Sequence, residues 1–278
     1  MNALRYVNIN GKLTDNATIP ADNSAFRYGV GIFETMLTIN VAIRLWQYHW
    51  ERLSSGLPVI GLIAPTLFTA DYMQEQILRT VHKNKPGALC RVRLQLFGGS
   101  GGIFGPDDNK PHFIIECYSL TPDILELNTN GLVIGIADEL RKSADALANL
   151  KSANALIYAA AARQAKTNKW NDALICNTNG NVIESAIANI FWIKDGAIHT
   201  PPLSDGCVAG VMRRHLLTAL PDITQQPLTA DELLTADEVF LTNAIKGIRW
   251  VGTIDSAAYH NNRTRQLYAA IRNSLELQ

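Results

Sequence analysis

The sequence lacks an excess of charge of either sign and a long uninterrupted apolar run. Its 278 residues include 25 Lys and Arg against 25 Asp and Glu, so the formal net charge is zero. A surface for nucleic acid or for an anionic membrane needs a basic surplus or patch, so we expect neither partner. The apolar stretches are broken well before the ~20 residues that span a bilayer. Residues 1–13 hold no charged segment followed by an apolar one, so they do not resemble a signal peptide.

Cysteine is scarce and scattered. The four cysteines, Cys90, Cys117, Cys176 and Cys207, form no CxxC pair. Without such a pair the sequence predicts neither a disulfide framework nor a cysteine metal site. We therefore expect buried, reduced thiols in a cytoplasmic protein, and no bound metal.

The sequence does contain the pattern of an α/β protein. Hydrophobic residues make up 47% of the chain and charged residues 18%, which is ordinary globular composition. Apolar alternation and turn pairs predict strands at 6–9, 12–13, 31–37, 42–45, 89–97, 113–118, 131–136, 173–176, 181–184, 191–193, 197–199 and 238–241. Helices are predicted at about 48–57, 65–83, 153–166, 210–220 and 263–275. The stretch 119–130 is typical of a linker, so we predict a smaller α/β domain over 1–120 and a larger one over 121–278.

Lys151 stands in a predicted strand-to-helix turn, in the order Leu150-Lys151-Ser152-Ala153-Asn154. A lysine in such a turn is in most proteins a solvated surface cation. The alternative is an imine-forming amine, which needs a partly desolvated site. The residue by itself does not decide between the two.

Glu184 ends a predicted strand and precedes the largely apolar stretch 185–191. A carboxylate buried there needs a partner, because an unpaired buried charge is costly. A protonated pyridine nitrogen would be such a partner, and it would make the ring of pyridoxal 5′-phosphate (PLP) an electron sink. A hairpin-end acid in water is the equally simple alternative.

Two loops and one arginine offer groups that bind a phosphate. Gly210 precedes a predicted helix, so the amides of Val211 and Met212 can face an anion. Residues 242–244 follow a buried strand and can close the same cradle, and Arg52 can supply a positive charge. Each feature has an ordinary alternative, because a glycine before a helix is often only a cap and an arginine on a helix is usually solvated.

Taken in order, these pieces resemble the class IV aminotransferase family, which consists of PLP enzymes of fold type IV. The family includes branched-chain aminotransferases, D-amino acid aminotransferases and 4-amino-4-deoxychorismate lyases. The resemblance extends over nearly the whole chain. It is carried by Tyr28-Gly29-Val30-Gly31-Ile32-Phe33-Glu34, residues 49–53, 151–154 and 172–191, Thr200-Pro201-Pro202, Gly210-Val211-Met212-Arg213 and residues 240–244.

The resemblance implies a fold, a cofactor and a set of roles. The fold would be the two-domain α/β (α+β) fold of the D-amino acid aminotransferase type, with PLP between the domains and a homodimer whose sites borrow residues from the neighbour. Lys151 would hold PLP as a Schiff base and act as the general acid and base, and Glu184 would partner the pyridine nitrogen. The other cofactor contacts would come from Arg52, Asn189, Val211, Met212, Asn243 and Ala244. A substrate carboxylate also needs a cation, for which Arg27, Arg93 and Arg249 are the candidates, and the sequence does not choose among them.

Local motifs separate the members of the family. In branched-chain aminotransferases the helix after the lysine usually carries an Asn-Tyr pair, whereas here Asn154 precedes Ala155. D-amino acid aminotransferases typically place an arginine and a histidine where this chain has the glycine-rich stretch 97–104, and a serine run where it has 186–188. The lyases resemble this chain in that glycine-rich stretch, in residues 188–192, in the methionine of 210–213 and in 243–244.

These motifs predict a 4-amino-4-deoxychorismate lyase, which eliminates pyruvate and leaves p-aminobenzoate for folate biosynthesis. The alternative is an amino-acid transaminase, of the D-amino acid or branched-chain type, that uses a 2-oxo acid acceptor. A third possibility is a binding protein of this fold that has lost catalysis, and the retention of both Lys151 and Glu184 argues against it. The predicted partners are a small amino-carboxylate substrate and a second copy of the chain.

Overall fold

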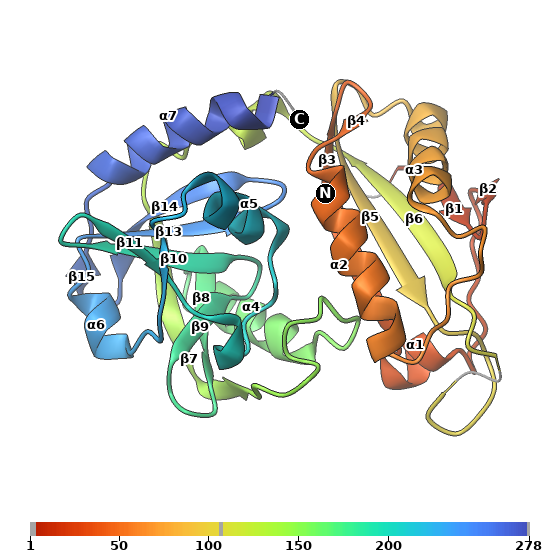
Figure 1. Ribbon diagram of the computed structural model, residues 1–278, viewed down its shortest axis with the longest axis horizontal. Helices are drawn as coiled ribbons and strands as arrows, with labels where there is room; N and C mark the ends of the chain where they lie inside the picture. The colour runs from red at the N-terminus through yellow and green to blue at the C-terminus, as the bar shows by residue number, and fades with distance from the viewer. Residues whose placement is uncertain (1–3, 106–107, 277–278) are drawn as a thin grey trace. The chain divides into compact units, whose positions relative to one another are not determined.

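The computed structural model describes residues 4–105 and 108–276, which divide into two compact units (Figure 1). Unit 1 comprises the described residues up to Ile124 together with Leu150–Asn154. Unit 2 comprises Leu125–Asn149 and the described residues from Ala155 onward. Residues 150–154, which the predicted boundary at 120/121 assigns to the second domain, therefore pack with unit 1.

Unit 1 is built on a six-stranded sheet with the order β2-β1-β6-β5-β3-β4. All of its strand pairings are antiparallel. Its elements are β1 (Val7–Ile9), β2 (Lys12–Thr14), α1 (Ser24–Tyr28), β3 (Gly31–Ile39), β4 (Ala42–Ile43), α2 (Trp46–Val59), α3 (Ala70–Asn84), β5 (Leu89–Phe97) and β6 (His112–Ser119).

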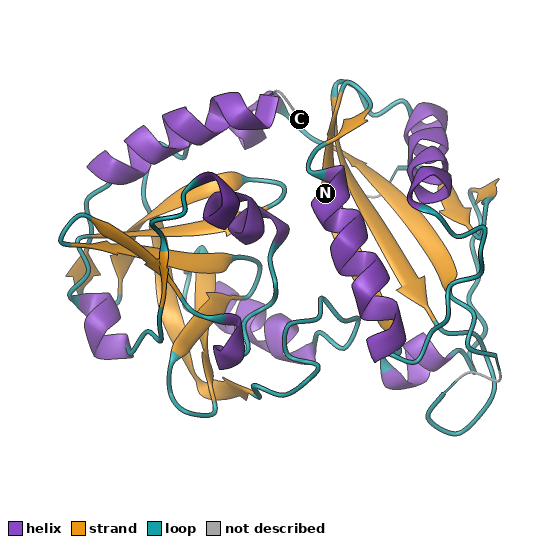
Figure 2. Ribbon diagram, viewed as in Figure 1, coloured by secondary structure: helices purple, strands orange, loops and turns teal. Residues whose placement is uncertain are grey.

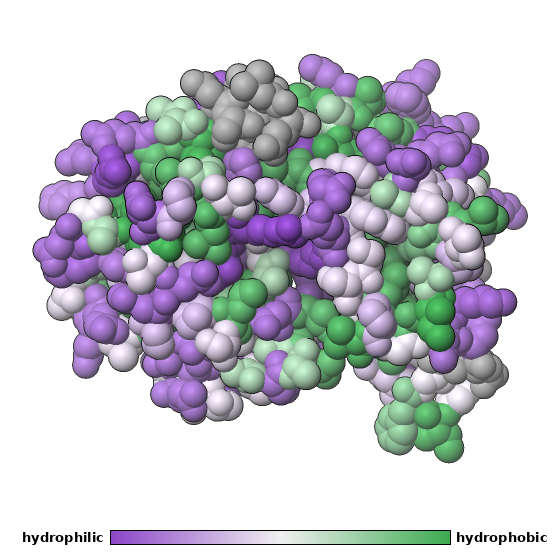
Figure 3. Space-filling model, viewed as in Figure 1, coloured by the Kyte–Doolittle hydropathy of each residue, from purple (hydrophilic) through white to green (hydrophobic). Residues whose placement is uncertain are grey.

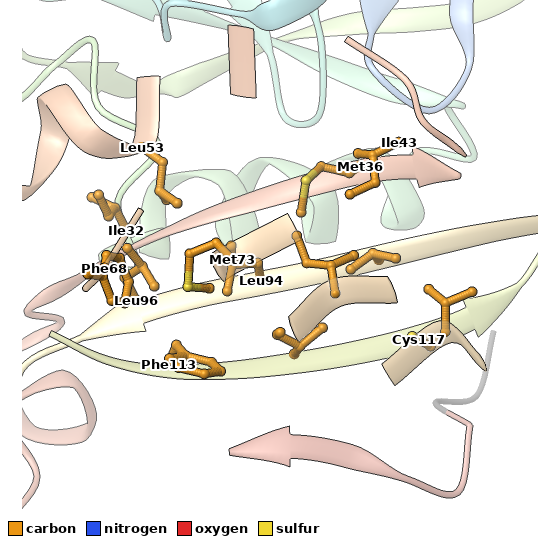
Figure 4. Close-up of a cluster of buried hydrophobic side chains, with 14 of the residues drawn as sticks. Ile32, Met36, Ile43, Leu53, Phe68, Met73, Leu94, Leu96, Phe113 and Cys117 are labelled. Carbon is orange, nitrogen blue, oxygen red and sulfur yellow. The ribbon is translucent and has the colours of Figure 1, made fainter. Parts of the chain in front are cut away.

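The core of unit 1 lies where helices α2 and α3 pack on this sheet (Figure 4). Met36 of β3 and Leu94 of β5 are fully buried, as are Leu53 of α2 and Met73 of α3 to within 1%. Burying an apolar side chain of this size contributes about 1.5–3 kcal/mol to the free energy of folding. The alternation of inward and outward side chains along β3 and β5 follows from the two-residue period of a strand.

Unit 2 contains a nine-stranded sheet with helices α4 to α7 around it (Figure 2). A 3-10 helix, Pro122–Leu125, leads into it. Its elements are β7 (Leu132–Lys142), α4 (Leu156–Thr167), β8 (Asp172–Asn177), β9 (Val182–Ser185), β10 (Asn189–Lys194), β11 (Ala197–Thr200), the 3-10 helix Leu203–Asp205, α5 (Val211–Ala219), β12 (Thr224–Gln225), α6 (Ala230–Leu234), β13 (Glu238–Asn243), β14 (Gly247–Ile254), β15 (Ala257–Ala258) and α7 (Asn262–Glu276).

The sheet of unit 2 closes on itself at β9 and β10. Eight of its strands follow the order β12-β11-β10-β13-β14-β7-β8-β9, and the ninth, β15, pairs with β14. Strand β9 pairs back with β10 through Glu184 and Asn189. The two pairings of β7, with β8 and with β14, are parallel. Two residues that the sequence singled out therefore face each other across the closing pair of strands.

The helix that follows Lys151 begins later than the sequence predicts. The predicted start is Ala153, but α4 begins at Leu156. The reason is tertiary: Phe33 N donates to Lys151 O at 2.9 Å and Ala153 N donates to Gly31 O at 2.7 Å, so the segment is extended against β3. The prediction also missed β14 and ended β7 at residue 136, six residues short of Lys142.

Candidate functional site

Lys151 is held by the edge of β3 in unit 1. Its backbone pairs with that strand, and its Nζ lies 4.6 Å from the centroid of the Phe33 ring. Gly31 makes the approach possible, because a Cβ there would lie 2.8 Å from Leu96 O and 3.4 Å from the side chain of Ala153. Lys151 is half-buried. It is thus a partly desolvated amine beside an aromatic ring, which is the setting an imine-forming lysine requires.

A buried cluster of Glu34, His49 and Arg52 lies in the same unit. Arg52 donates from Nε to Glu34 Oε1 at 2.7 Å and from Nη2 to Oε2 at 2.5 Å, and His49 Nδ1 lies 2.6 Å from Oε2. Burial raises the pKa of Glu34, but the charges of Arg52 and His49 outweigh burial and lower this pKa to about 2. Burial lowers the pKa of His49 more than Glu34 raises it. The carboxylate therefore fixes the orientation of Arg52.

The three arginines predicted to bind the substrate carboxylate lie in different environments. The guanidinium carbon of Arg93 lies 4.5 Å from the centroid of the same Phe33 ring that Lys151 approaches, and Arg93 also faces Glu116 at 3.8 Å. Arg27 is exposed at the end of α1. Arg249 is buried, and its Nη1 donates to the carbonyls of residues 246 and 248. Of the three, Arg93 is the one that shares an aromatic contact with Lys151.

Glu184 is buried, with 3% of its surface exposed, in unit 2. Its Oε1 accepts from Lys142 Nζ at 2.7 Å and from Tyr158 Oη at 2.8 Å, and its Oε2 accepts from Val208 N at 2.9 Å. The alternative of a solvated hairpin-end acid is therefore wrong. Neither of the two side-chain partners, Lys142 and Tyr158, was predicted from the sequence.

Tyr158 had a recognisable signal in the sequence and Lys142 had none. Tyr158 stands three and seven residues before Ala161 and Ala165, and this spacing places all three on one face of α4. Lys142 ends a strand whose continuation past residue 136 the sequence did not predict. Burial, followed by the charge of Glu184, raises the pKa of Tyr158. The hydroxyl therefore stays protonated and donates a hydrogen bond to Glu184.

Asn189, Gly210 and helix α5 form one structural group. Asn189 Nδ2 donates to Val208 O at 2.9 Å, and its Oδ1 lies so close to Gly210 that a Cβ there would be 1.8 Å away. Helix α5 begins at Val211, as predicted to within one residue, and Met212 follows it in the first turn. No described side chain caps this helix start. The first amides of α5 therefore have no intrahelical acceptor and suit an anion.

The turn after β13 lies beside this group. Thr242 pairs with Asn189 across β13 and β10, and Thr242 Oγ1 is buried with no partner among the described residues. Asn243 Oδ1 accepts from the amides of Ile245 at 3.1 Å and Lys246 at 2.8 Å, so it shapes the turn that contains Ala244. A buried hydroxyl without a partner is costly and indicates a missing acceptor.

The residues of unit 2 fit a ligand that carries a ring nitrogen and a phosphate. The Glu184 carboxylate has about four acceptor positions and accepts hydrogen bonds from three donors. One position is left for an N–H donor. The uncapped α5 start and the Thr242 hydroxyl supply donors for an anion. Val208 links the two parts, because its amide contacts Glu184 and its carbonyl contacts Asn189. A ring nitrogen and a phosphate are features of PLP, so these groups fit the class of PLP-dependent enzymes.

The particular family follows from comparison with known proteins. The chain belongs to the amino-transferase class IV family, whose sequence pattern matches residues 31–254. It is 28% identical over 244 residues to the aminodeoxychorismate lyase of Vibrio harveyi, which covers 86% of this chain and 88% of the lyase. It is 26% identical over 252 residues to the branched-chain-amino-acid aminotransferase of Pseudomonas aeruginosa, covering 86% and 81% of the two chains.

A solved structure agrees with this assignment. The crystal structure of a putative 4-amino-4-deoxychorismate lyase from Legionella pneumophila superposes with a TM-score of 0.83 and 26% identity, over 93% of this chain and 96% of that chain. The predicted fold type, the PLP cofactor and the enzymatic class are thereby confirmed. The roles of the individual site residues stay predictions.

Other expectations concern the rest of the molecule. All four cysteines are buried and carry free thiols, as predicted. Within the described ranges, no group of three His, Cys, Asp or Glu side chains is arranged to hold a metal ion. No helix in the described part of the chain is both long and apolar enough to cross a bilayer.

Proposed function

We propose that this chain is an aminodeoxychorismate lyase, which converts 4-amino-4-deoxychorismate into p-aminobenzoate and pyruvate. Its substrate class rests on one observation: Lys151, whose place on the cofactor a substrate amine would take, and Arg93, which would bind a carboxylate, approach the same Phe33 ring. The choice of the lyase rests on the similarity to the Vibrio and Legionella proteins and on the glycine-rich stretch 98–102.

Two residues of the chain would hold the cofactor's reactive parts. Lys151 would bind PLP covalently through Nζ, and Glu184 would accept a hydrogen bond from the N–H of the pyridine ring. PLP bound in this way supplies an electron-poor ring that accepts the electron pair released at the substrate carbon. Within unit 2, Asn149 donates to Leu203 O and Cys207 O, in the loop that precedes Val208, whose amide contacts Glu184.

Lys151 would also move the proton. Its Nζ, when it is not bonded to the cofactor, would take the proton from the substrate ring carbon that bears the nitrogen. The bond from the substrate ring to the enolpyruvyl oxygen would then break, the substrate ring would become aromatic, and the departing fragment would gain a proton to become pyruvate. Arg93 would hold a substrate carboxylate, with Phe33 placed beside both groups. Guanidinium groups bind carboxylates through paired hydrogen bonds, which fixes the orientation of the substrate.

A transaminase is the second candidate, and the Pseudomonas relative favours it. The same Lys151 would serve, with a 2-oxo acid as the second substrate. Against the branched-chain type stands the lack of its Asn-Tyr pair, which lies one residue later than Asn154, because here Asn154 is followed by Ala155. Tyr158, which lies further along α4, does not take the role of that tyrosine, because its hydroxyl donates to Glu184.

The deciding experiment supplies purified holoenzyme with 4-amino-4-deoxychorismate and no keto acid. Release of p-aminobenzoate and pyruvate in equal amounts is the expected result. Parallel cuvettes contain D- or L-amino acids with 2-oxoglutarate. Keto-acid-dependent turnover there, with no p-aminobenzoate in the first cuvette, would replace the lyase by a transaminase.

We also propose that the enzyme is a cytoplasmic homodimer. Four free buried thiols suit a reducing compartment. Phe26, Ile103 and Phe104 are 76%, 85% and 77% exposed, and Phe104 contacts Tyr28 of α1. Figure 3 shows apolar side chains, in green, gathered at the lower right, where Figure 1 draws the loop before β6. An apolar patch of this kind marks an interface, and light scattering of the wild type and of Phe104→Ser tests it: a dimer weakened by the substitution is expected.

A further inference from the structure

Lys142 and Tyr158 both contact the same oxygen of Glu184. Lys142 Nζ lies 2.7 Å and Tyr158 Oη 2.8 Å from Oε1, and Lys142 Nζ also donates to Tyr158 Oη at 2.6 Å. The side chains of Lys142 and Glu184 are only 11% and 3% exposed. The three residues come from β7, α4 and β9, so the contact exists only in the folded unit. Ion pairs this buried are expensive to form and need a function or excellent geometry.

The other oxygen of Glu184 is held differently. Oε2 accepts from the backbone amide of Val208 at 2.9 Å. A carboxylate offers about two acceptor positions on each oxygen. Two donors therefore fill Oε1, whereas Oε2 keeps one position. Because both oxygens are anchored, the plane of the carboxylate cannot rotate freely.

We propose that Lys142 and Tyr158 are positioning residues that fix the Glu184 carboxylate so that Oε2 presents its remaining acceptor position to the pyridine N–H of PLP. This inference rests on the proposed role of Glu184. Lys142 supplies the positive charge that a buried carboxylate needs before the cofactor arrives. Tyr158 ties Lys142 and Glu184 into one hydrogen-bonded triangle. Neither residue is assigned a contact with the substrate.

The experiment measures PLP affinity, which is independent of the reaction catalysed. Apoprotein is titrated with PLP, and the absorbance of bound cofactor gives the apparent dissociation constant. The variants are Lys142→Met, which keeps an unbranched side chain one atom shorter and removes the charge, Tyr158→Phe, which removes only the hydroxyl, Lys142→Arg, Glu184→Gln and the double variant Lys142→Met with Glu184→Gln. Apoprotein melting temperatures are recorded in parallel.

The expected weakening of PLP binding is about tenfold for Lys142→Met, in the range of one charge-assisted hydrogen bond, and about threefold for Tyr158→Phe. Lys142→Arg should recover most of the affinity. The double variant should bind PLP no more weakly than Glu184→Gln alone, because residues that act through a shared partner are not additive. Tyr158→Phe keeps the test valid if Lys142→Met does not fold.

Each other outcome is informative. Wild-type affinity in both Lys142→Met and Tyr158→Phe, with Glu184→Gln weakened, would overturn the positioning role and leave the proposed function intact. Additive losses in the double variant, accompanied by lower melting temperatures, would show a merely structural contribution and would also overturn it. A wild-type protein that fails to bind PLP would instead refute the proposed function itself.

Discussion

Arg52 reaches the Glu34 carboxylate with two parallel hydrogen bonds, from Nε to Oε1 and from Nη2 to Oε2. Glu34 is 1% exposed, and His49 contacts the same carboxylate. This pairing holds a long side chain in one orientation, which a phosphate-binding arginine requires. It also makes the stability of unit 1 dependent on the ionisation of Glu34.

Acid should destabilise the protein through Glu34. Its pKa is about 2 in the folded state against an ordinary value of 4.5. A lowered pKa stabilises the fold above the ordinary value, so about 3 kcal/mol should be lost as the pH falls from about 4.5 to about 2. Urea unfolding at a series of pH values measures this. Glu34→Gln should be less stable at pH 7 by roughly 3–5 kcal/mol and should lose this pH dependence, whereas the surface variant Glu126→Gln should behave like the wild type.

Lys151→Ala should abolish turnover and covalent attachment of PLP. The variant lacks both the attachment point and the proton acceptor, so we expect a loss of at least about 10³-fold. Borohydride treatment followed by intact-mass measurement checks the attachment: the wild type should gain the mass of reduced PLP and the variant should not. Lys166→Ala, at the exposed end of α4, is the control and should match the wild type. Appreciable turnover by Lys151→Ala would remove this lysine from the mechanism.

Gly210→Ala should weaken PLP binding and stability together. The added Cβ would lie 1.8 Å from Asn189 Oδ1, so either Asn189 or the start of α5 must move. Overpacking of this kind costs about 1–3 kcal/mol, and displaced α5 amides should reduce PLP affinity by about tenfold. Urea unfolding and PLP titration measure the two effects. Gly105→Ala, where no atom lies within 4 Å of the new Cβ, should change neither.

Thr242→Val should separate stability from cofactor affinity. Thr242 Oγ1 is buried without a partner among the described residues, so its removal should leave the apoprotein as stable or more stable by about 1 kcal/mol. If Oγ1 contacts the phosphate, PLP affinity should fall about fivefold. Thr264→Val is the opposite case: Thr264 Oγ1 donates to Glu238 at 2.7 Å, so that variant should lose stability and keep its PLP affinity. Unchanged PLP affinity in Thr242→Val would exclude this hydroxyl from the site.

Arg93→Gln should raise KM for the substrate more than it lowers kcat. Loss of one charged contact to a carboxylate is worth about 1.5–3 kcal/mol, so KM should rise at least tenfold. Steady-state kinetics with 4-amino-4-deoxychorismate measures the effect. Arg91→Gln, two residues earlier on β5, is the matched control, because Arg91 lies over the Tyr118 ring instead. An unchanged KM in Arg93→Gln would return the choice to Arg27 and Arg249.

Local patterns were sufficient to predict several elements. The start of α5 was predicted because Gly210 cannot continue a strand favourably and an amphipathic stretch follows it. The strands around 173–176 and 238–241 were recognised because each is a short, continuous apolar run. Lys151 and Glu184 were selected by residue type and position, and the structure finds the first half-buried and the second buried and paired.

The hydrogen-bond and ion-pair partners of these residues could not be predicted from the sequence. The segment after Lys151 was predicted as helix on its alanines, but hydrogen bonds to β3 hold residues 151–153 extended. Glu34 was predicted only as part of a family motif, because no local pattern indicates that this strand residue forms an ion pair with Arg52 of the following helix. Lys142 was not predicted because β7 and β9 are near each other only through β8, the strand that pairs with both of them.

The sequence by itself determined that this protein is a class IV PLP enzyme, because the ordered motifs record which residue types the cofactor needs. The tertiary structure alone decided what those residues touch. It gave Glu184 its counter-ion in Lys142, gave Lys151 its aromatic neighbour in Phe33, and left Thr242 with an unused hydroxyl. The physical reason is that motifs specify local geometry and chemistry, whereas buried charges are paired by contacts between strands and helices far apart in the chain.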